Sequence, residues 1–202
     1  MQGPFRAVLP LVLASASPRR QALLAGQGLH FSVRPSAGPE PAPLPDEEPA
    51  TYAARMASLK GQDVAQTHPG AVIISADTIV VVGNAILGKP KNPDQALDML
   101  RALADQWHEV MTGFCVLHQK HRVHVCRTVT TRVHMPLTPE TLLRAYIATG
   151  EPMDKAGAYG IQGCGAFLVD EVQGSYTNVV GLPLRSVMDV LLDIQAIAPF
   201  LC

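Results

Sequence analysis

Short apolar runs alternate along the chain with segments that begin at a helix cap, and this alternation constrains the fold more than any other feature. The runs Ala7–Leu13 and Ala71–Ala76 are apolar without a helical period, which is typical of buried strands. Ser17–Pro18 and Asn92–Pro93 each place a capping side chain before a proline, a pair that favours the first turn of a helix. Strands that alternate with helices predict an α/β domain.

The remaining segments extend the same pattern. We expect the strand that begins at Ala71 to end at Asp77. A hairpin follows it, and Gly83-Asn84 predicts the turn between the two strands of that hairpin. A proline-rich segment, 35–49, predicts a loop. Further strands are predicted at 31–33, 108–118, 123–133 and 166–172, and further helices at 51–64, 138–150 and 184–197. With no repeat and no linker, we expect a single domain over residues 1–202.

The charge balance excludes a polyanionic partner. The chain has 16 Lys and Arg against 17 Asp and Glu, whereas proteins that bind nucleic acid polymers or acidic membranes usually carry a basic excess. Charged residues make up 16% of the chain and hydrophobic residues 48%, so a large core can form. The apolar stretch Ala7–Ala14 is too short for a membrane span. We therefore expect neither a nucleic acid polymer nor a membrane as partner.

The four cysteines show no CxxC pairing: Cys115, Cys126, Cys164 and Cys202. This spacing favours reduced thiols over a zinc site or a structural disulfide. His118, His121 and His124 lie on a predicted surface hairpin without a carboxylate pattern, and we do not expect them to bind a metal. The N-terminal residues lack the features of a secretory signal, so the sequence predicts a cytoplasmic location.

The segment Leu13–Arg20, LASASPRR, predicts a phosphate site. A buried strand that turns into a capped helix leaves the first N–H groups of the helix unpaired at the positive end of its dipole. Ser15 adds a hydroxyl donor, and Arg19 and Arg20 add guanidinium groups suited to phosphate oxygens. In the alternative interpretation Ser17 is only a helix cap and the arginines are solvated.

Asp77 is the candidate for metal binding or for orienting a water molecule. An acid where an apolar strand ends faces the ligand-binding edge of an α/β sheet, and Mg²⁺ is commonly bound through one or two carboxylates. Asp77 can instead cap the following turn. The scattered lysines, Lys60, Lys89, Lys91 and Lys155, are weaker candidates individually.

The glycine-rich segment Lys155–Gly165 permits close approach of the backbone to a ligand. It matches neither a P-loop nor a dinucleotide-binding fingerprint, and a plain glycine loop is the alternative. Gln162 stands out, because its amide both donates and accepts hydrogen bonds and can read the edge of a nucleotide base.

Seven strings in order along the chain resemble the Maf family of nucleoside triphosphate pyrophosphatases. They are LASASPRR at 13–20, RMASLKG at 55–61, SADTIVV at 75–81, LGKP at 87–90, HEVMTG at 108–113, DKAGAYGIQG at 154–163 and NVVGLPL at 178–184. The resemblance implies an α/β fold with a mixed central sheet flanked by helices and a cleft between two lobes. It also implies cleavage of a nucleoside triphosphate to the monophosphate and pyrophosphate.

The resemblance assigns roles to individual residues. Asp77 matches the family's proton acceptor, and KAGAYGIQG resembles the branch that acts on dTTP and UTP. Positions tied to substrate choice match Arg19, Thr78 and Gln162, and further polar positions of the cleft match Ser15, Arg20, Glu40, Lys60 and Lys89. We therefore expect Asp77 and Glu40 to hold a divalent cation, Mg²⁺ or Mn²⁺, and Ser15, Arg20, Lys60 and Lys89 to bind phosphate.

One departure from the family pattern concerns Glu40, which stands after Pro39 where the family often has an acidic pair. Gly61 stands where alanine is common. Two alternatives remain. The substrate can be 7-methyl-GTP or another modified nucleotide, or the chain can inhibit septum formation through a protein partner, a role also associated with the family. A homodimer is one assembly that the sequence leaves open.

Overall fold

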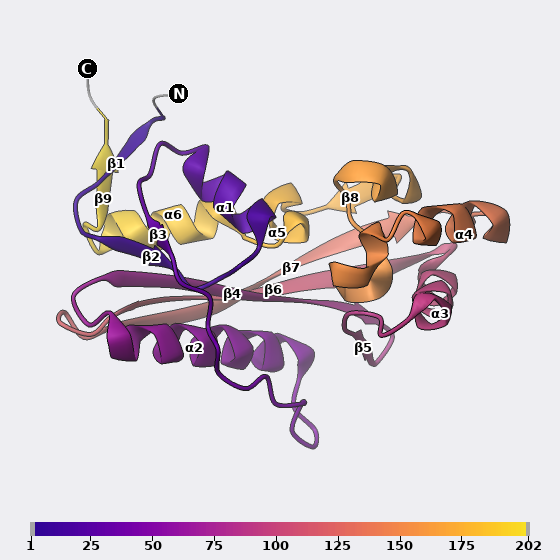
Figure 1. Ribbon diagram of the computed structural model, residues 1–202, viewed down its shortest axis with the longest axis horizontal. Coiled ribbons are helices and arrows are strands. Elements are labelled where there is room, and N and C mark those ends of the chain that lie inside the picture. The colour runs from indigo at the N-terminus through magenta and orange to yellow at the C-terminus, as the bar shows by residue number, and fades with distance from the viewer. Residues whose placement is uncertain (1–2, 201–202) are drawn as a thin grey trace. The chain divides into compact units, whose positions relative to one another are not determined.

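The computed structural model describes residues 3–200, and its centre is a mixed seven-stranded sheet (Figure 1). The strand order is β3-β2-β4-β6-β7-β8, and β5 pairs with β4. Strand β2 is parallel to β3 and β4, whereas β4–β5 and β7–β8 are antiparallel, which confirms the predicted mixed α/β sheet. The strands are β2 (Leu11–Leu13), β3 (Ser32–Val33), β4 (Val72–Val82), β5 (Ala85–Leu87), β6 (Gln106–His118), β7 (Val123–Met135) and β8 (Glu171–Gln173).

Two helices, α1 (Pro18–Ala25) and α3 (Pro93–Leu103), begin where the sequence places their caps. Ser17 accepts a hydrogen bond from the N–H of Arg20, and Asn92 accepts one from the N–H of Gln95. The helices are α1 (Pro18–Ala25), α2 (Pro49–Thr67), α3 (Pro93–Leu103), α4 (Glu140–Ala148), α5 (Tyr176–Val180) and α6 (Leu184–Asp193), with 3-10 turns η1 (Glu151–Asp154), η2 (Ala156–Ala158) and η3 (Gly163–Leu168). Within residues 3–200, no helix combines the length and the apolar character needed to cross a membrane.

The chain divides into two compact units, each assembled from separate stretches of sequence. Unit 1 comprises residues 1–77, 112–129 and 181–202, and unit 2 comprises residues 78–111 and 130–180. Strands β4, β6 and β7 each run from one unit into the other. The single domain over residues 1–202 and the cleft between lobes stay predictions.

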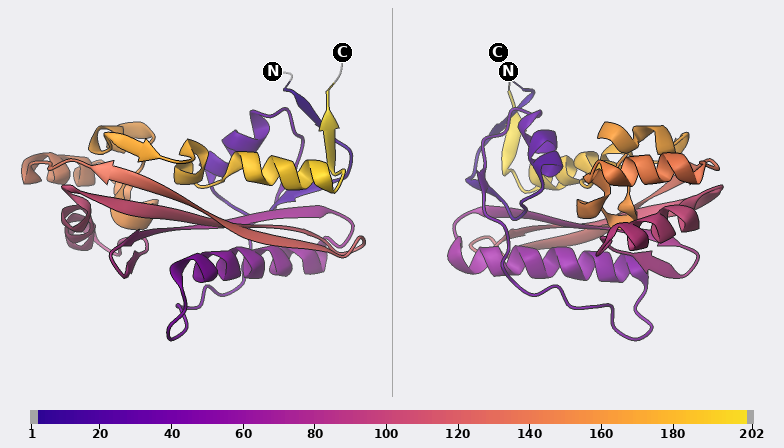
Figure 2. Two further views of the ribbon diagram at one scale, coloured as in Figure 1. Left: turned by 180° about the vertical axis from the view of Figure 1, so that it is seen from behind. Right: turned by 45° about the vertical axis from the view of Figure 1, so that its right-hand side comes forward.

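Unit 1 has helices on both faces of its part of the sheet. Leu11 and Leu13 of β2 point into a core with α1 and α6, whereas Val12 and Ala14 point into a core with α2. This alternation follows from the period of two along a strand. Figure 1 shows α2 on one face and α1 and α6 on the other, and the two views of Figure 2 agree.

Helix α2 packs unusually close to the sheet. A Cβ added at Gly113 of β6 would lie 2.2 Å from the carbonyl oxygen of Ala53, and one added at Gly61 would lie 2.4 Å from Cδ1 of Leu117. The buried hydroxyl of Ser75 on β4 donates a hydrogen bond of 2.7 Å to the carbonyl of Ala57. The absence of a side chain at Gly61 therefore permits the close approach of α2 to Leu117.

Unit 2 has its own core, in which α3 and α4 pack with β-strand residues such as Val80, Val110 and Val133. The imidazole of His108 lies within this core and its Nε2 is 2.7 Å from the hydroxyl of Tyr159. Burial, together with the nearby His134, lowers the pKa of His108 to about 4. His108 is therefore neutral at pH 7.

Several predicted elements have other boundaries in the structure. The strand expected at Ala7–Leu13 is two strands, β1 (Phe5–Ala7) and β2, because the N–H groups of Val8 and Leu9 both bond to the carbonyl of Ala196 and Pro10 has no N–H. Of the strand expected at 166–172, residues 166–168 belong to the turn η3, and only 171–172 lie in a strand, β8. The helix expected at 184–197 ends at Asp193, and β9 (Ile197–Pro199) pairs with β1.

The strand expected to end at Asp77 continues to Val82, so Asp77 and Thr78 lie in the middle of β4. Both are half-buried between fully buried residues. Polar residues interrupt the apolar run without ending the strand, because strand pairing depends on the backbone. The hairpin turn at Gly83-Asn84 is confirmed by the antiparallel pairing of Val82 with Ala85.

The prediction of reduced cysteines was also wrong for one pair. Cys115 on β6 and Cys126 on β7 form a disulfide, with their Cα atoms 4.2 Å apart. Their separation of 11 residues resembles no disulfide or metal motif, and the sheet alone brings them together. Cys164 is a free, exposed cysteine, and Cys202 lies outside the described residues.

The contact between α2 and β6 makes a prediction for Gly113. Replacing Gly113 with Ala places a methyl group against the backbone of Ala53, which cannot move aside as a side chain can, and we expect a loss of about 2–4 kcal/mol in the free energy of unfolding. Urea unfolding followed by circular dichroism measures this loss. Gly70→Ala is the matched control, because a Cβ at Gly70 meets nothing within 4 Å. Equal stability of the two variants would contradict the close contact.

Candidate active site

The turn from β2 into α1 holds Arg20 in a fixed position. Its Nε donates a hydrogen bond of 2.7 Å to the carbonyl of Gly181, and its Nη1 donates one of 3.2 Å to Oγ of Ser15. The buried hydroxyl of Ser15 also accepts from the N–H of Ser17 at 3.2 Å. Ser15 therefore orients the guanidinium group of Arg20, in addition to the phosphate contact that the sequence predicts for it.

Arg20 lies in a mixed electrostatic environment. Burial lowers the pKa of Arg20, and the positive charge of Arg19 adds to this effect, whereas the carboxylates of Asp77 and Glu40 oppose it. An arginine keeps its charge at neutral pH even so. A half-buried guanidinium group with poor hydration is suited to bind an anion such as phosphate.

The ammonium group of Lys60 joins the two predicted metal ligands. Lys60 Nζ lies 2.7 Å from Oδ1 of Asp77 and 2.9 Å from Oε1 of Glu40. The side chains of Lys60 and Asp77 are only 17% and 16% exposed, whereas that of Glu40 is 65% exposed. Asp77 is thus the inner acid of the pair and Glu40 the outer one.

The two acids also determine the charge of Lys60. Burial alone would lower the pKa of Lys60, but the charge and hydrogen bonds of Asp77 and Glu40 outweigh it and raise the pKa. Lys60 is therefore fully protonated at neutral pH. A partly buried ion pair of this kind is stronger than a surface pair, because water screens it less.

The loop that carries Glu40 is fastened along α2. Near one end of the loop, Asp63 accepts hydrogen bonds from Ser36 Oγ and from the N–H groups of Ala37 and Gly38. Near the other end, Arg55 and Glu47 form a salt bridge of 2.6 Å, and the hydrogen bond from Arg55 lowers the pKa of Glu47 to about 2. These contacts hold Glu40 beside Lys60.

Tyr52 is a member of this group that the sequence did not indicate. Its hydroxyl donates to the carbonyl of Pro41 in the loop, at 3.2 Å. Burial raises the pKa of Tyr52, and the charge of Asp77 adds to the rise. Tyr52 stands eight residues before Lys60 on α2, and this helical spacing was the only signal that placed it on the same side of the helix.

The residues around Asp77 suit a hard divalent cation. Two carboxylates already converge on one cationic group, and Mg²⁺ and Mn²⁺ prefer oxygen ligands of this type. The donor chemistry of Asp77 and Glu40 thus fits the predicted metal. In unit 1 the structure brings together six of the predicted site residues: Ser15, Arg19, Arg20, Glu40, Lys60 and Asp77.

The other three predicted site residues belong to unit 2. Thr78 is half-buried in β4, Lys89 is exposed after β5, and Gln162 is exposed at the start of η3. A pocket in unit 2 lies between α3 and α4 and is lined by Lys91, Arg144 and others. Of its lining residues, only Lys91 is a candidate from the sequence, as one of the four scattered lysines.

Glu151 fixes the backbone of the loop that carries Gln162, and the sequence did not indicate this role. Its carboxylate accepts hydrogen bonds from the N–H groups of Cys164 and Gly165, at 2.8 and 3.1 Å, and from the hydroxyl of Tyr146 at 3.0 Å. Burial alone would raise the pKa of Glu151, but these donors outweigh it and lower the pKa. Glu151 is therefore ionised at neutral pH.

Lys155 and the glycines complete the anchoring of this loop. Lys155 Nζ donates hydrogen bonds to the carbonyl of Glu151 and to the carboxylate of Asp154, both at 2.6 Å. Its ammonium group therefore stabilises the loop itself. A Cβ at Gly163 would lie 2.6 Å from Oε2 of Glu151, and one at Gly165 would lie 2.5 Å from the hydroxyl of Tyr146. The glycines thus permit close packing around Glu151.

Comparison with known proteins agrees with the resemblance noted in the sequence. The chain is 48% identical over 195 residues to a protein of Nitratidesulfovibrio vulgaris named dTTP/UTP pyrophosphatase, covering 96% of this chain and 92% of that protein. A protein of Desulfotalea psychrophila with the same name is 47% identical over 189 residues, covering 94% and 96%. The sequence profile of the family described as Maf-like protein matches residues 10–194, and the chain belongs to this family.

Proposed function

We propose that the chain is a nucleoside triphosphate pyrophosphatase that hydrolyses dTTP and UTP to the monophosphate and pyrophosphate. The observation that carries the proposal is the arrangement of Lys60 between Asp77 and Glu40, with Arg20 in the same electrostatic environment. Acids and cations gathered in one place are typical of phosphoryl transfer, in which positioning and electrostatics supply most of the catalysis. The names of the relatives support the same activity.

The cationic side chains bind the phosphates in this proposal. Arg20, oriented by Ser15 and Gly181, presents a guanidinium group whose fork matches phosphate oxygens. Lys60 and Lys89 supply ammonium groups that offset the charge on the departing pyrophosphate. Arg20 is already oriented by two hydrogen bonds, so little side-chain entropy is lost when it binds phosphate.

Asp77 orients the attacking water and accepts its proton. Its position as the inner, more buried acid favours this role over Glu40, whose side chain is mostly exposed. Asp77 and Glu40 would hold Mg²⁺ or Mn²⁺, and the metal would supply positive charge at the phosphate oxygens when bound.

Gln162 selects the base. Its amide matches a pyrimidine edge that offers both a donor and an acceptor, and a wrong base leaves polar groups without partners. Arg19 and Thr78 contribute to substrate choice, as the family resemblance implies. Because Glu151 holds the N–H groups of Cys164 and Gly165, it fixes the loop in which Gln162 stands, and we assign it as a positioning residue.

A cytoplasmic location agrees with this activity, because the nucleoside triphosphate substrates are metabolites of the cytoplasm. A homodimer remains part of the proposal, and size-exclusion chromatography with light scattering measures it directly.

Replacing Asp77 with Asn removes the negative charge and the proton acceptor. We expect pyrophosphate release from dTTP to fall by about 10²- to 10⁴-fold, the usual contribution of a general base. The matched control is Asp189→Asn, which breaks only a surface ion pair with Arg185 and should leave turnover unchanged. Circular dichroism checks that both variants fold. Turnover by folded Asp77→Asn at the wild-type rate would refute the assigned role.

A panel of nucleoside triphosphates tests the substrate. We expect dTTP and UTP to be cleaved much faster than ATP and GTP, only with Mg²⁺ or Mn²⁺ present, and Gln162→Ala to reduce this preference by about 10- to 100-fold. Gln173→Ala, a surface glutamine on β8, is the matched control. Including 7-methyl-GTP and 5-methyl-UTP separates the alternative substrates. Equal rates for all bases, or activity without a metal, would each overturn part of the proposal.

Glu151→Gln tests the positioning role. The amide group of the glutamine would face backbone N–H donors, so the loop loses at least one hydrogen bond and shifts. We expect the ratio of kcat/KM for UTP to that for GTP to fall by about tenfold, which corresponds to about 1.4 kcal/mol. Glu171→Gln, an exposed acid on β8, is the control. A purely structural role would lower both rates equally and leave the ratio unchanged.

A further inference from the structure

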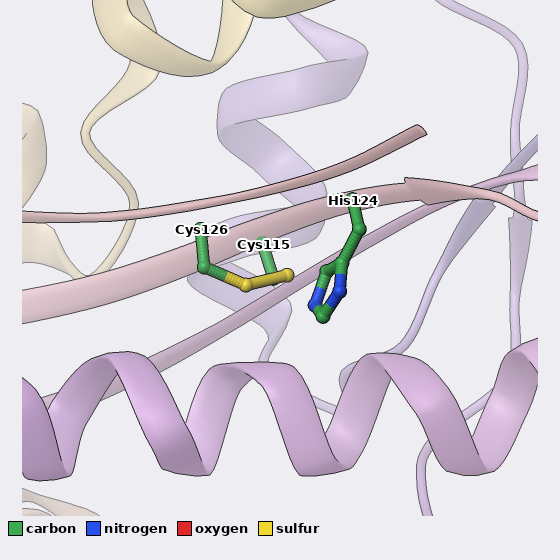
Figure 3. Close-up of side chains that lie close together, drawn as sticks. All are labelled: Cys115, His124 and Cys126. Carbon is green, nitrogen blue, oxygen red and sulfur yellow. A yellow bond between two sulfur atoms is a disulfide. The ribbon is translucent and has the colours of Figure 1, made fainter. Parts of the chain in front are cut away.

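The hairpin of β6 and β7 gathers two sulfur atoms and an imidazole on one face of the sheet in unit 1. Cys115 lies on β6, and Cys126 and His124 lie two residues apart on β7. One ligand atom from each of the three side chains lies within 4.8 Å of the others. Figure 3 shows the imidazole of His124 beside the sulfur atoms, above helix α2.

The cluster has a buried side and an open side. Cys115 is fully buried in the core between α2 and the sheet, Cys126 is half-buried at the edge of that core, and His124 is exposed. A solute can therefore reach the cluster past His124. Ser58 of α2 borders it, with Oγ 3.0 Å from Nε2 of His124.

The sulfur atoms are bonded to each other in the structure, and a disulfide offers no thiolate to a metal. A reductant frees them. A phosphine, for example, takes up the oxygen of one water molecule and leaves two thiols, and cellular dithiols do the same by exchange. In a reducing compartment, cysteines brought together in an enzyme more often bind a metal than form a lasting disulfide.

We propose that the reduced protein binds one Zn²⁺ ion through the sulfur atoms of Cys115 and Cys126 and a ring nitrogen of His124. Two thiolates and one imidazole are ligands that zinc prefers. The fourth tetrahedral position is left for water or the hydroxyl of Ser58. Binding releases the two thiol protons. The zinc complex and the disulfide exclude each other, because two sulfur atoms that are bonded to each other cannot act as thiolate ligands.

This site is distinct from the one proposed for catalysis. It shares no residue with Asp77 and Glu40, whose oxygen atoms suit a hard cation, whereas sulfur ligands suit a soft one. The proposal therefore stands whether or not the protein hydrolyses nucleotides, and its test does not use turnover.

The test compares metal binding by reduced and oxidised protein. The whole chain is reduced with a phosphine, freed of metal, and titrated with Zn²⁺ against a chromophoric chelator, and with Co²⁺ as a spectroscopic probe. We expect one ion per reduced chain, a thiolate-to-cobalt charge-transfer band, and no binding by protein whose disulfide has been formed with peroxide. Absence of a stoichiometric ion in the reduced protein, or equal binding by the oxidised protein, would overturn the proposal.

Variants identify the ligands. His124→Ala changes an exposed side chain, so it should fold normally, and we expect its zinc affinity to fall by at least about tenfold. His121→Ala, an exposed histidine of the same hairpin, is the matched control. Cys126→Ala should abolish the charge-transfer band, and Cys164→Ala should leave it intact. Unchanged affinity in His124→Ala, or loss of the band in Cys164→Ala, would refute the ligand set.

Alkylation followed by mass spectrometry gives a second measurement that does not depend on variants. Zinc should slow the labelling of the half-buried Cys126 in reduced protein, while the exposed Cys164 reacts at the same rate with and without the metal. Equal protection of Cys126 and Cys164 would show a general effect of zinc and would refute the site.

Discussion

The close contact between α2 and the sheet determines where the charged groups of unit 1 lie. Gly113 lets β6 approach the backbone of Ala53, Gly61 lets the helix approach Leu117, and Ser75 bonds to the carbonyl of Ala57. Packing of this kind leaves the helix no freedom to slide or rotate, because interiors are as dense as organic crystals. Lys60, one residue before Gly61, is consequently held within hydrogen-bond distance of Asp77 on β4.

The same helix also organises the proline-rich loop. Arg55 and Asp63 bind the two ends of the loop, and Lys60 binds Glu40 between them. A loop with so many prolines loses less conformational entropy on ordering than an ordinary one, since each proline fixes its own φ angle. A few polar contacts are therefore enough to hold an exposed acid beside a half-buried lysine.

Local signals in the sequence predicted the local features of the fold, whereas contacts between distant segments escaped them. The caps at Ser17 and Asn92 and the turn at Gly83-Asn84 depend on neighbouring residues, and all three were predicted correctly. The disulfide between Cys115 and Cys126 and the carboxylate anchoring by Glu151 depend on tertiary structure. Asp77 was singled out for a local reason that was wrong, since its strand does not end there. The family resemblance, and not the pattern, indicated Glu40 as its companion.

The net charge of the whole chain does not reveal the local charge at the proposed site. The sequence carries 16 cationic and 17 acidic residues, yet Arg19, Arg20 and Lys60 gather with only two acids, Glu40 and Asp77. The excess of one positive charge is too small to neutralise a triphosphate, which carries several negative charges. A divalent cation held by the two acids would supply the difference, and Lys60 keeps the acids together without it. The acids that lower the net charge of the site are thus the groups that make it suitable for a metal.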